Sequence, residues 1–113
     1  MRYALIICDD ESDRRGPVEL VGDPRHVAWI DYLDGRGITL LDGVRLRSST
    51  DSTTVRARNG ETLISDGPFV EAKEQIGGFA LIECANLDDA IEAAARHPFA
   101  AHGVVEVRPV WDE

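Results

Sequence analysis

The chain has 113 residues, and its 12 Lys and Arg against 21 Asp and Glu give a formal net charge of −9. A chain of this length buries about two thirds of the surface that it exposes when unfolded, and its 43% hydrophobic content is too high for a disordered protein. The acidic charge disfavours nucleic acid, and the longest apolar run, 4–8, is too short to cross a bilayer or to form a signal peptide. We therefore expect one cytoplasmic domain over residues 1–113, with no direct nucleic-acid partner and no membrane.

The first predicted elements are a strand and a helix. Residues 2–8 are rich in aliphatic side chains and predict a strand, and the acidic stretch 9–24 predicts a long loop. Asp23-Pro24 is typical of a helix start, because Asp accepts from exposed amides and Pro is tolerated in the first turn. The helix is expected to continue to about Arg36. Its inward stripe comprises His26, Trp29, Ile30 and Leu33.

A second strand and a hairpin follow. Residues 38–46 predict a strand with a bulge or bend at Asp42-Gly43. Apolar and charged residues then alternate over 55–58, and residues 61–64 are the expected partner strand. Asn59-Gly60 between them is suited to positive φ, which favours a tight turn. The sequence therefore predicts a β-hairpin.

The last third predicts a strand, a helix and a strand. The turn residues 65–68 end the hairpin, and 79–84 form the next strand. Asn86 is expected to cap a second helix, which Pro98 ends, and 104–110 form the last strand. The expected inward stripe of this helix is Leu87, Ala90, Ile91 and Ala94.

This order of elements predicts an α+β, ferredoxin-like fold, in which two helices cover one face of an antiparallel sheet. The other face of such a sheet has no helices of its own. A second copy of the sheet or a ligand would cover it. We therefore expect a homodimer in which two sheets face each other.

His26 is the most informative polar residue in the sequence. It lies on the apolar stripe of the first helix and in its first turn, where exposed amides disfavour a charged imidazole. A neutral imidazole can act as a general base. Two interpretations stay open: catalysis, or a half-buried side chain with an ordinary backbone partner.

Asp66-Gly67-Pro68-Phe69 forms a stiff turn whose carboxylate either caps backbone amides or points into a pocket beside Phe69. Near the C-terminus, Glu106 and Arg108 share one face of the last strand, where an Arg can hold a carboxylate. The spacing of His26, His97 and His102 does not indicate a metal site, and at the helix end His97 is expected to interact with helix carbonyls. We expect no metal.

The segment 66–79, with Leu87-Asp88-Asp89-Ala90 and the closing stretch 105–110, resembles the DGPF branch of the YCII-related proteins. The resemblance covers almost the whole chain and implies the dimeric α/β-barrel form of the ferredoxin-like fold. It implies no general activity, although the YCII branch is discussed as an enzyme with a His and an Asp in a cleft. His26 matches that histidine. The Asp-Pro-aromatic segment of that branch reads His97-Pro98-Phe99 here, which leaves Asp66 as the substitute carboxylate.

Three hypotheses follow. The first is a small-molecule enzyme or binder with a pocket between the first helix and the sheet, in which His26 is the base, Asp66 orients it, and Arg45 or Arg108 holds an anionic substrate. The second is a non-catalytic dimeric interaction or regulatory module with a protein partner, since some relatives resemble domains associated with sigma-factor-like transcription proteins. The third, by fold analogy, is a haem-using or cofactor-free monooxygenase.

We expect no cofactor. The candidate catalytic residues are His26 and Asp66, and the candidate ligand contacts are Trp29, Arg45, Phe69 and Arg108.

Overall fold

The computed structural model describes residues 1–13 and 23–111. Its strands are β1 (Arg2–Asp9), β2 (Thr39–Arg45), β3 (Thr53–Arg58), β4 (Glu61–Asp66), β5 (Gln75–Glu83) and β6 (Val104–Pro109), and its helices are α1 (Pro24–Gly35) and α2 (Leu87–Ala95), with short 3₁₀ turns η1 (Glu11–Asp13), η2 (Ser49–Asp51) and η3 (Pro98–Ala101). The expected loop 9–24 falls largely outside the described residues. None of the helices described is long and apolar enough to span a membrane.

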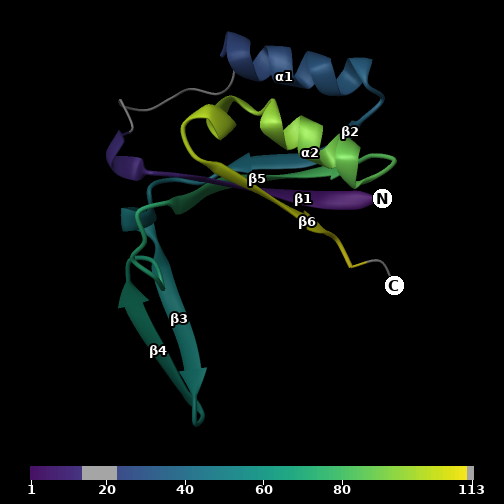
Figure 1. The fold of residues 1–113 in the computed structure, drawn as a ribbon. Coiled ribbons are helices and arrows are strands. Elements are labelled where there is room, and N and C mark those ends of the chain that lie inside the picture. The colour runs from purple at the N-terminus through teal and green to yellow at the C-terminus, as the bar shows by residue number, and fades with distance from the viewer. Residues whose placement is uncertain (14–22, 112–113) are drawn as a thin grey trace.

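The main sheet has four antiparallel strands in the order β2-β5-β1-β6. Both helices lie on the same side of this sheet, with α1 on the outside (Figure 1). The predicted α+β architecture with an antiparallel sheet and two helices is therefore confirmed, and the strand order is compatible with a ferredoxin-like fold. The core lies between the helices and the sheet, where Tyr3, Leu5, Leu33 and Ile82 are almost fully buried.

The first helix begins and packs as the sequence predicts. Asp23 is its N-cap and accepts a hydrogen bond from the backbone N–H of Arg25, 2.8 Å away. Trp29 and Leu33 are buried on its inner face. The indole Nε1–H of Trp29 donates to the carbonyl oxygen of Ala93 at 2.9 Å, which ties α1 to α2.

The predicted inner face of α2 is confirmed for Ala90 and Ala94 and is wrong for Leu87 and Ile91. Asn86 caps the helix as expected, but Leu87 and Ile91 are about half exposed. The buried residues are Ala90, Ala93 and Ala94. Large side chains from the other elements, such as Trp29, already fill the space under α2, so its contact face is made of alanines. The inner face is therefore turned toward Ala93 and away from Leu87 and Ile91 relative to the predicted stripe.

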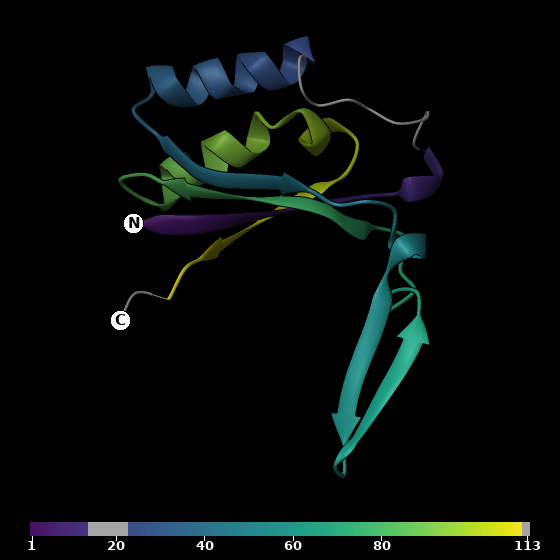
Figure 2. The same cartoon turned by 180° about the vertical axis from the view of Figure 1, so that it is seen from behind.

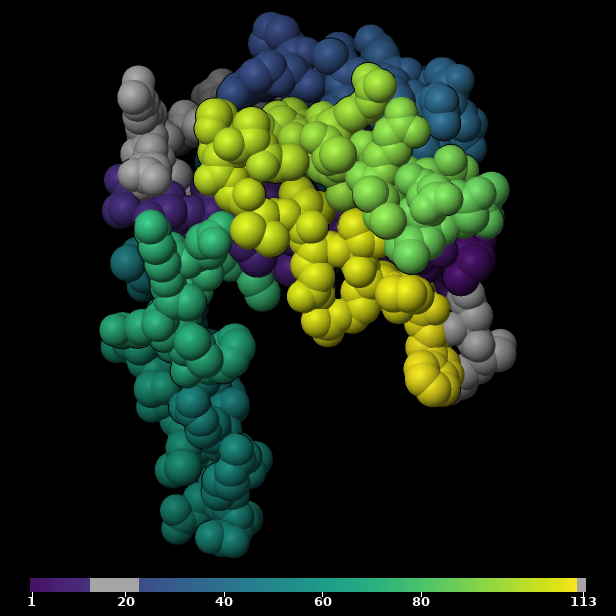
Figure 3. Space-filling model, viewed as in Figure 1, coloured from purple at the N-terminus to yellow at the C-terminus, as the bar shows by residue number. Residues whose placement is uncertain are grey.

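The β3–β4 hairpin stands apart from the main sheet. Its turn is formed by Asn59 and Gly60, at φ 51° and 77°, as the sequence predicts. At its base, the N–H of Gly67 donates to the carbonyl oxygen of Ser52 at 2.7 Å. The hairpin extends on the side of the main sheet opposite the helices (Figure 2) and projects clear of the rest of the molecule in the space-filling view (Figure 3).

Two irregularities bend the sheet near its β2–β5 side. The register of β1 and β5 shifts between Ile7 and Cys8, so Gly77 is an extra residue of β5. The register of β2 and β5 shifts between Leu40 and Asp42, beside the predicted Asp42-Gly43 bend. Bulges of this kind redirect side chains and are common next to functional sites.

The sheet face away from the helices carries an apolar patch beside the charged residues Glu106 and Arg108, and it has no cover in the described chain. Phe79 lies opposite Ile6 on one side and opposite Val44 on the other, so all three share this face. Val104 lies there too, opposite Cys8. We call this surface, formed by Ile6, Val44, Phe79 and Val104, the open face.

Candidate functional site

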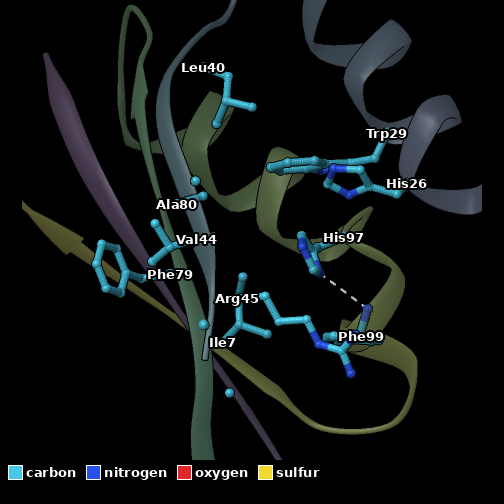
Figure 4. Close-up of a pocket in the computed structure, with 13 residues that line it drawn as sticks. Ile7, His26, Trp29, Leu40, Val44, Arg45, Phe79, Ala80, His97 and Phe99 are labelled. Carbon is cyan, nitrogen blue, oxygen red and sulfur yellow. Dashed lines mark hydrogen bonds between the residues drawn. The ribbon is translucent and has the colours of Figure 1, made fainter. Parts of the chain in front are cut away.

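A pocket of about 270 Å³ lies between α1, η3 and the helix-facing side of β2 and β5 (Figure 4). Its walls combine aliphatic and aromatic side chains with two histidines and one arginine. The described residues that line it are Ile7, His26, Trp29, Leu40, Gly43, Val44, Arg45, Gly77, Gly78, Phe79, Ala80, His97 and Phe99. The side chains of Val44 and Phe79 belong to the open face and point away from the two histidines (Figure 4), so these two residues border the pocket with their backbone.

Aromatic rings form a row along one wall of the pocket. The ring centroid of Trp29 lies 6.0 Å from that of His26 and 4.8 Å from that of His97, and the His97 ring is 5.7 Å from Phe99. His26 comes from the first turn of α1, and its buried Nδ1 has no hydrogen-bond partner among the described residues. A buried polar atom without a protein partner is uncommon and indicates a place for a ligand or water.

The sequence predicts that the side chain of His97 interacts with helix carbonyls, and this prediction is wrong. His97 caps η3 instead, and its Nδ1 accepts from the backbone N–H of Phe99 at 3.2 Å (Figure 4). Since an accepting Nδ1 carries no proton, the neutral ring carries its proton on Nε2. Burial, with the nearby charge of His26 as a smaller cause, lowers the pKa of His97 from 6.5 to about 4. The imidazole is therefore neutral at physiological pH.

Arg45 reaches the pocket from the end of β2. Arg45 lies opposite Gly78 of β5, and Gly78 lies opposite buried Ile7 of β1. The side chain of Arg45 is therefore on the same, helix-facing side of the sheet as that of Ile7. Figure 4 shows this side chain extending toward Phe99. Gly78 is required here, because a Cβ at this position would come within 2.6 Å of the backbone oxygen of Val44.

The structure brings three of the predicted site residues together, since His26, Trp29 and Arg45 all line the pocket. Asp66, by contrast, is exposed at the end of β4 and does not line it. Phe69 is 71% exposed beyond the hairpin.

Arg108 pairs with Glu106 at 2.6 Å on the sheet face opposite the pocket, because these residues lie opposite Ala4 and Ile6. The pairing that the structure offers His26 is therefore with His97 rather than with Asp66.

Sequence reasoning gave His97 no functional role, although one signal was present. His97-Pro98-Phe99 stands where the YCII branch has Asp-Pro-aromatic, so the position was marked but its residue type was not the expected one. For Gly43 the sequence predicts only a bulge or bend. It lies opposite Ala80 on the helix-facing side, and a Cβ added there would meet no atom within 4 Å.

Among the described residues, no three His, Cys, Asp or Glu side chains converge in a way that could hold a metal ion. The pocket can therefore supply two imidazoles and one guanidinium to a ligand, together with apolar walls. No carboxylate comes from the part of its lining that the structure describes.

The structure is that of an α+β protein with two helices on one face of an antiparallel sheet and a histidine-containing pocket between α1, η3 and the sheet. The sequence matches the YCII-related domain over residues 1–113, and the chain belongs to this family. It is also 47% identical over 68 residues to an uncharacterized protein of Rhizobium meliloti (strain 1021), a match that covers 58% of this chain and 55% of that protein. The chain thus spans about half the length of this relative. The expected family is confirmed, and the DGPF branch stays a prediction.

Proposed function

We propose that this chain binds a small molecule in the pocket and transfers a proton there through His26, with His97 as a neutral hydrogen-bond donor. The observation that carries the proposal is the meeting of two imidazoles from α1 and η3 at one apolar cavity. Pockets that combine apolar walls with a few convergent polar groups are typical ligand sites.

The two imidazoles have different roles in this proposal. His26 offers a buried nitrogen with no partner among the described residues, which suits it to accept a proton from a bound molecule. His97 has a pKa of about 4 and is therefore a neutral imidazole at neutral pH, and because its Nδ1 accepts from Phe99, its remaining proton is on Nε2. It can donate this hydrogen bond to an oxygen on which negative charge develops, without losing or gaining a proton itself.

Filling the pocket tests the proposal before any substrate is known. Gly43→Leu adds a side chain on the pocket side of β2, where an added Cβ meets nothing within 4 Å. We expect small fragments to shift the side-chain nitrogen NMR signals of His26 and His97 in the wild-type chain. In the Gly43→Leu chain these shifts are expected to disappear.

Gly35→Leu is the matched control. Gly35 ends α1, its Cβ would also meet nothing within 4 Å, and it does not line the pocket. Fragment binding is expected to survive this change. Fragments that bind without shifting either histidine signal, or that bind Gly43→Leu as well as wild type, would contradict the proposal.

We also propose that a second copy of the chain covers the open face. Val44, Phe79 and Val104 are each more than two fifths exposed on this face, beside the Glu106–Arg108 ion pair, and exposed apolar side chains with polar neighbours are typical of interaction surfaces. The hairpin extends on the same side of the sheet (Figure 1), so a second sheet packed there would lie beside it.

The alternative role is an interaction module whose partner is another protein. The observation that favours it is the projecting hairpin, on which Val55 and Ile64 form an exposed apolar pair. The two roles predict different effects of substitutions on the binding of a protein partner. A purely interacting chain keeps its partner when His26→Ala is introduced, and loses it when Val55 and Ile64 are changed to Asp.

A further inference from the structure

We infer that the ligand of this pocket is a small molecule with one carboxylate and an apolar remainder, and that Arg45 holds the carboxylate. The inference rests on the proposed function and names the chemical class of its ligand. Three independent observations carry it: the charge of the pocket lining, the pairing of the arginines and the size of the cavity.

The pocket is a locally basic region of an acidic protein. The chain contains 21 Asp and Glu, yet none of the 13 described lining residues is acidic, and Arg45 is the one among them with a permanent charge. The potential inside such a cavity favours an anion over a neutral molecule or a cation.

Arg45 differs from most of the other described arginines. Five of them pair with nearby carboxylates: Arg25 with Asp23, Arg36 with Asp89 and Glu92, Arg47 with Asp51, Arg96 with Glu92 and Arg108 with Glu106. The structure shows no such carboxylate for Arg45 among the described residues. Its planar guanidinium can take a carboxylate through two parallel hydrogen bonds.

The rest of the lining limits the ligand to a single negative charge. His97 is neutral at physiological pH, and Ile7, Leu40 and Trp29 are apolar. A second negative charge would enter the pocket without a permanent cation to offset its lost hydration. A volume of about 270 Å³ lies just below the ~300 Å³ at which pockets for larger ligands begin. The ligand is therefore a single ring or a short chain.

Pairs of nearly isosteric probes test this inference. We expect benzoate to bind the wild-type chain about tenfold more tightly than benzamide in titration calorimetry, because a hydrogen bond between two charged groups is stronger than one to a neutral amide. Phthalate and inorganic phosphate are expected to bind more weakly than benzoate. The preference for benzoate should shrink as salt is added.

Two arginine variants assign the effect to one side chain. Arg45→Met is expected to bring the ratio of the two affinities to about one, with benzamide binding changed by less than about twofold, because only the charged contact is lost. Arg47→Met removes the same charge two residues away, from an exposed side chain paired with Asp51, and is expected to keep the wild-type ratio.

The results separate this inference from the proposed function. If both probes bind equally and Gly43→Leu abolishes both, the pocket binds ligands but the carboxylate inference is wrong. The inference is also wrong if phthalate or inorganic phosphate binds more tightly than benzoate. If neither probe, nor any of a panel of small carboxylates and their amides, binds the wild-type pocket, both proposals are wrong.

Discussion

At the scale of a single residue, the protonation of His97 makes the free energy of unfolding depend on pH. In the unfolded chain an imidazole takes up a proton near pH 6.5, whereas the folded chain keeps His97 neutral down to about pH 4. The unfolded state therefore binds more protons between these values. The free energy of unfolding should fall as the pH is lowered through this window and stop falling, on account of His97, below about pH 4.

His97→Asn tests this linkage. Asparagine is a good N-cap residue, so it keeps an acceptor for the N–H of Phe99, but it does not titrate. Between pH 7 and pH 5 we expect the wild-type chain to lose about 1 to 2 kcal/mol more than the variant, less than complete desolvation would give, because the ring borders an open pocket. Urea unfolding at the two pH values measures the difference.

His102→Asn is the control for this measurement. It removes an exposed imidazole from the end of the same short turn, away from the pocket lining. The variant should lose as much stability on acidification as wild type. An equally steep loss in His97→Asn would show that His97 is not the source of the pH dependence.

The site was predictable where side-chain chemistry follows from local position, and unpredictable where it depends on distant contacts. His26, Trp29 and Arg45 were selected from a helix stripe and a strand, and they do meet at one pocket. Asp66 is predicted as a site residue only as the substitute for the carboxylate that the family resemblance implies. Its position depends on the direction in which the hairpin leaves the sheet, and local sequence carries no information on that direction.

Individual elements were easier to predict than their faces. The hairpin followed from Asn59-Gly60, because few residues adopt positive φ, and α1 followed from Asp23 and Pro24. The inner face of α2 was predicted only in part, because its neighbour Trp29 limits the space beneath it, and that contact joins residues 64 positions apart.

At the scale of elements, the β3–β4 hairpin contributes no side chain to the core. Among the described residues, each one that forms the core belongs to the main sheet, to the two helices or to their connections, and none belongs to β3 or β4. Ser52 and Gly67 already lie side by side at the base of the hairpin, through their 2.7 Å hydrogen bond. A two-residue Asn-Gly turn in place of residues 53–66 can therefore close the gap.

We expect this shortened chain to fold with a melting temperature within about 5 °C of wild type, because no core side chain is removed. Circular dichroism on heating measures the transition, and its cooperativity should be kept. As a control, Leu5→Ala, which removes a fully buried side chain from β1, should lower stability by about 2 to 5 kcal/mol. A shortened chain that melts without cooperativity would show that the hairpin is part of the folding unit.

At the scale of the whole molecule, the main sheet has a helix-covered face that forms the core and an open face that exposes apolar side chains. A second copy packed on the open face would bury Val104 near Cys8. Introducing a carboxylate there, as in Val104→Asp, would place two unpaired charges in the interface of a symmetric dimer, one from each copy. The variant should therefore be monomeric, and the wild-type chain dimeric, in light scattering coupled to size-exclusion chromatography.

Ile91→Asp provides the comparison that makes this result specific. Ile91 is 51% exposed on α2 and Val104 is 49% exposed on β6, so both changes place a charge at similarly exposed apolar positions. Because Ile91 lies on a helix, on the other side of the sheet, its variant should keep the wild-type mass. A wild-type chain that is monomeric at every concentration, or a dimer that persists in Val104→Asp and dissociates in Ile91→Asp, would mean that a second copy does not cover the open face.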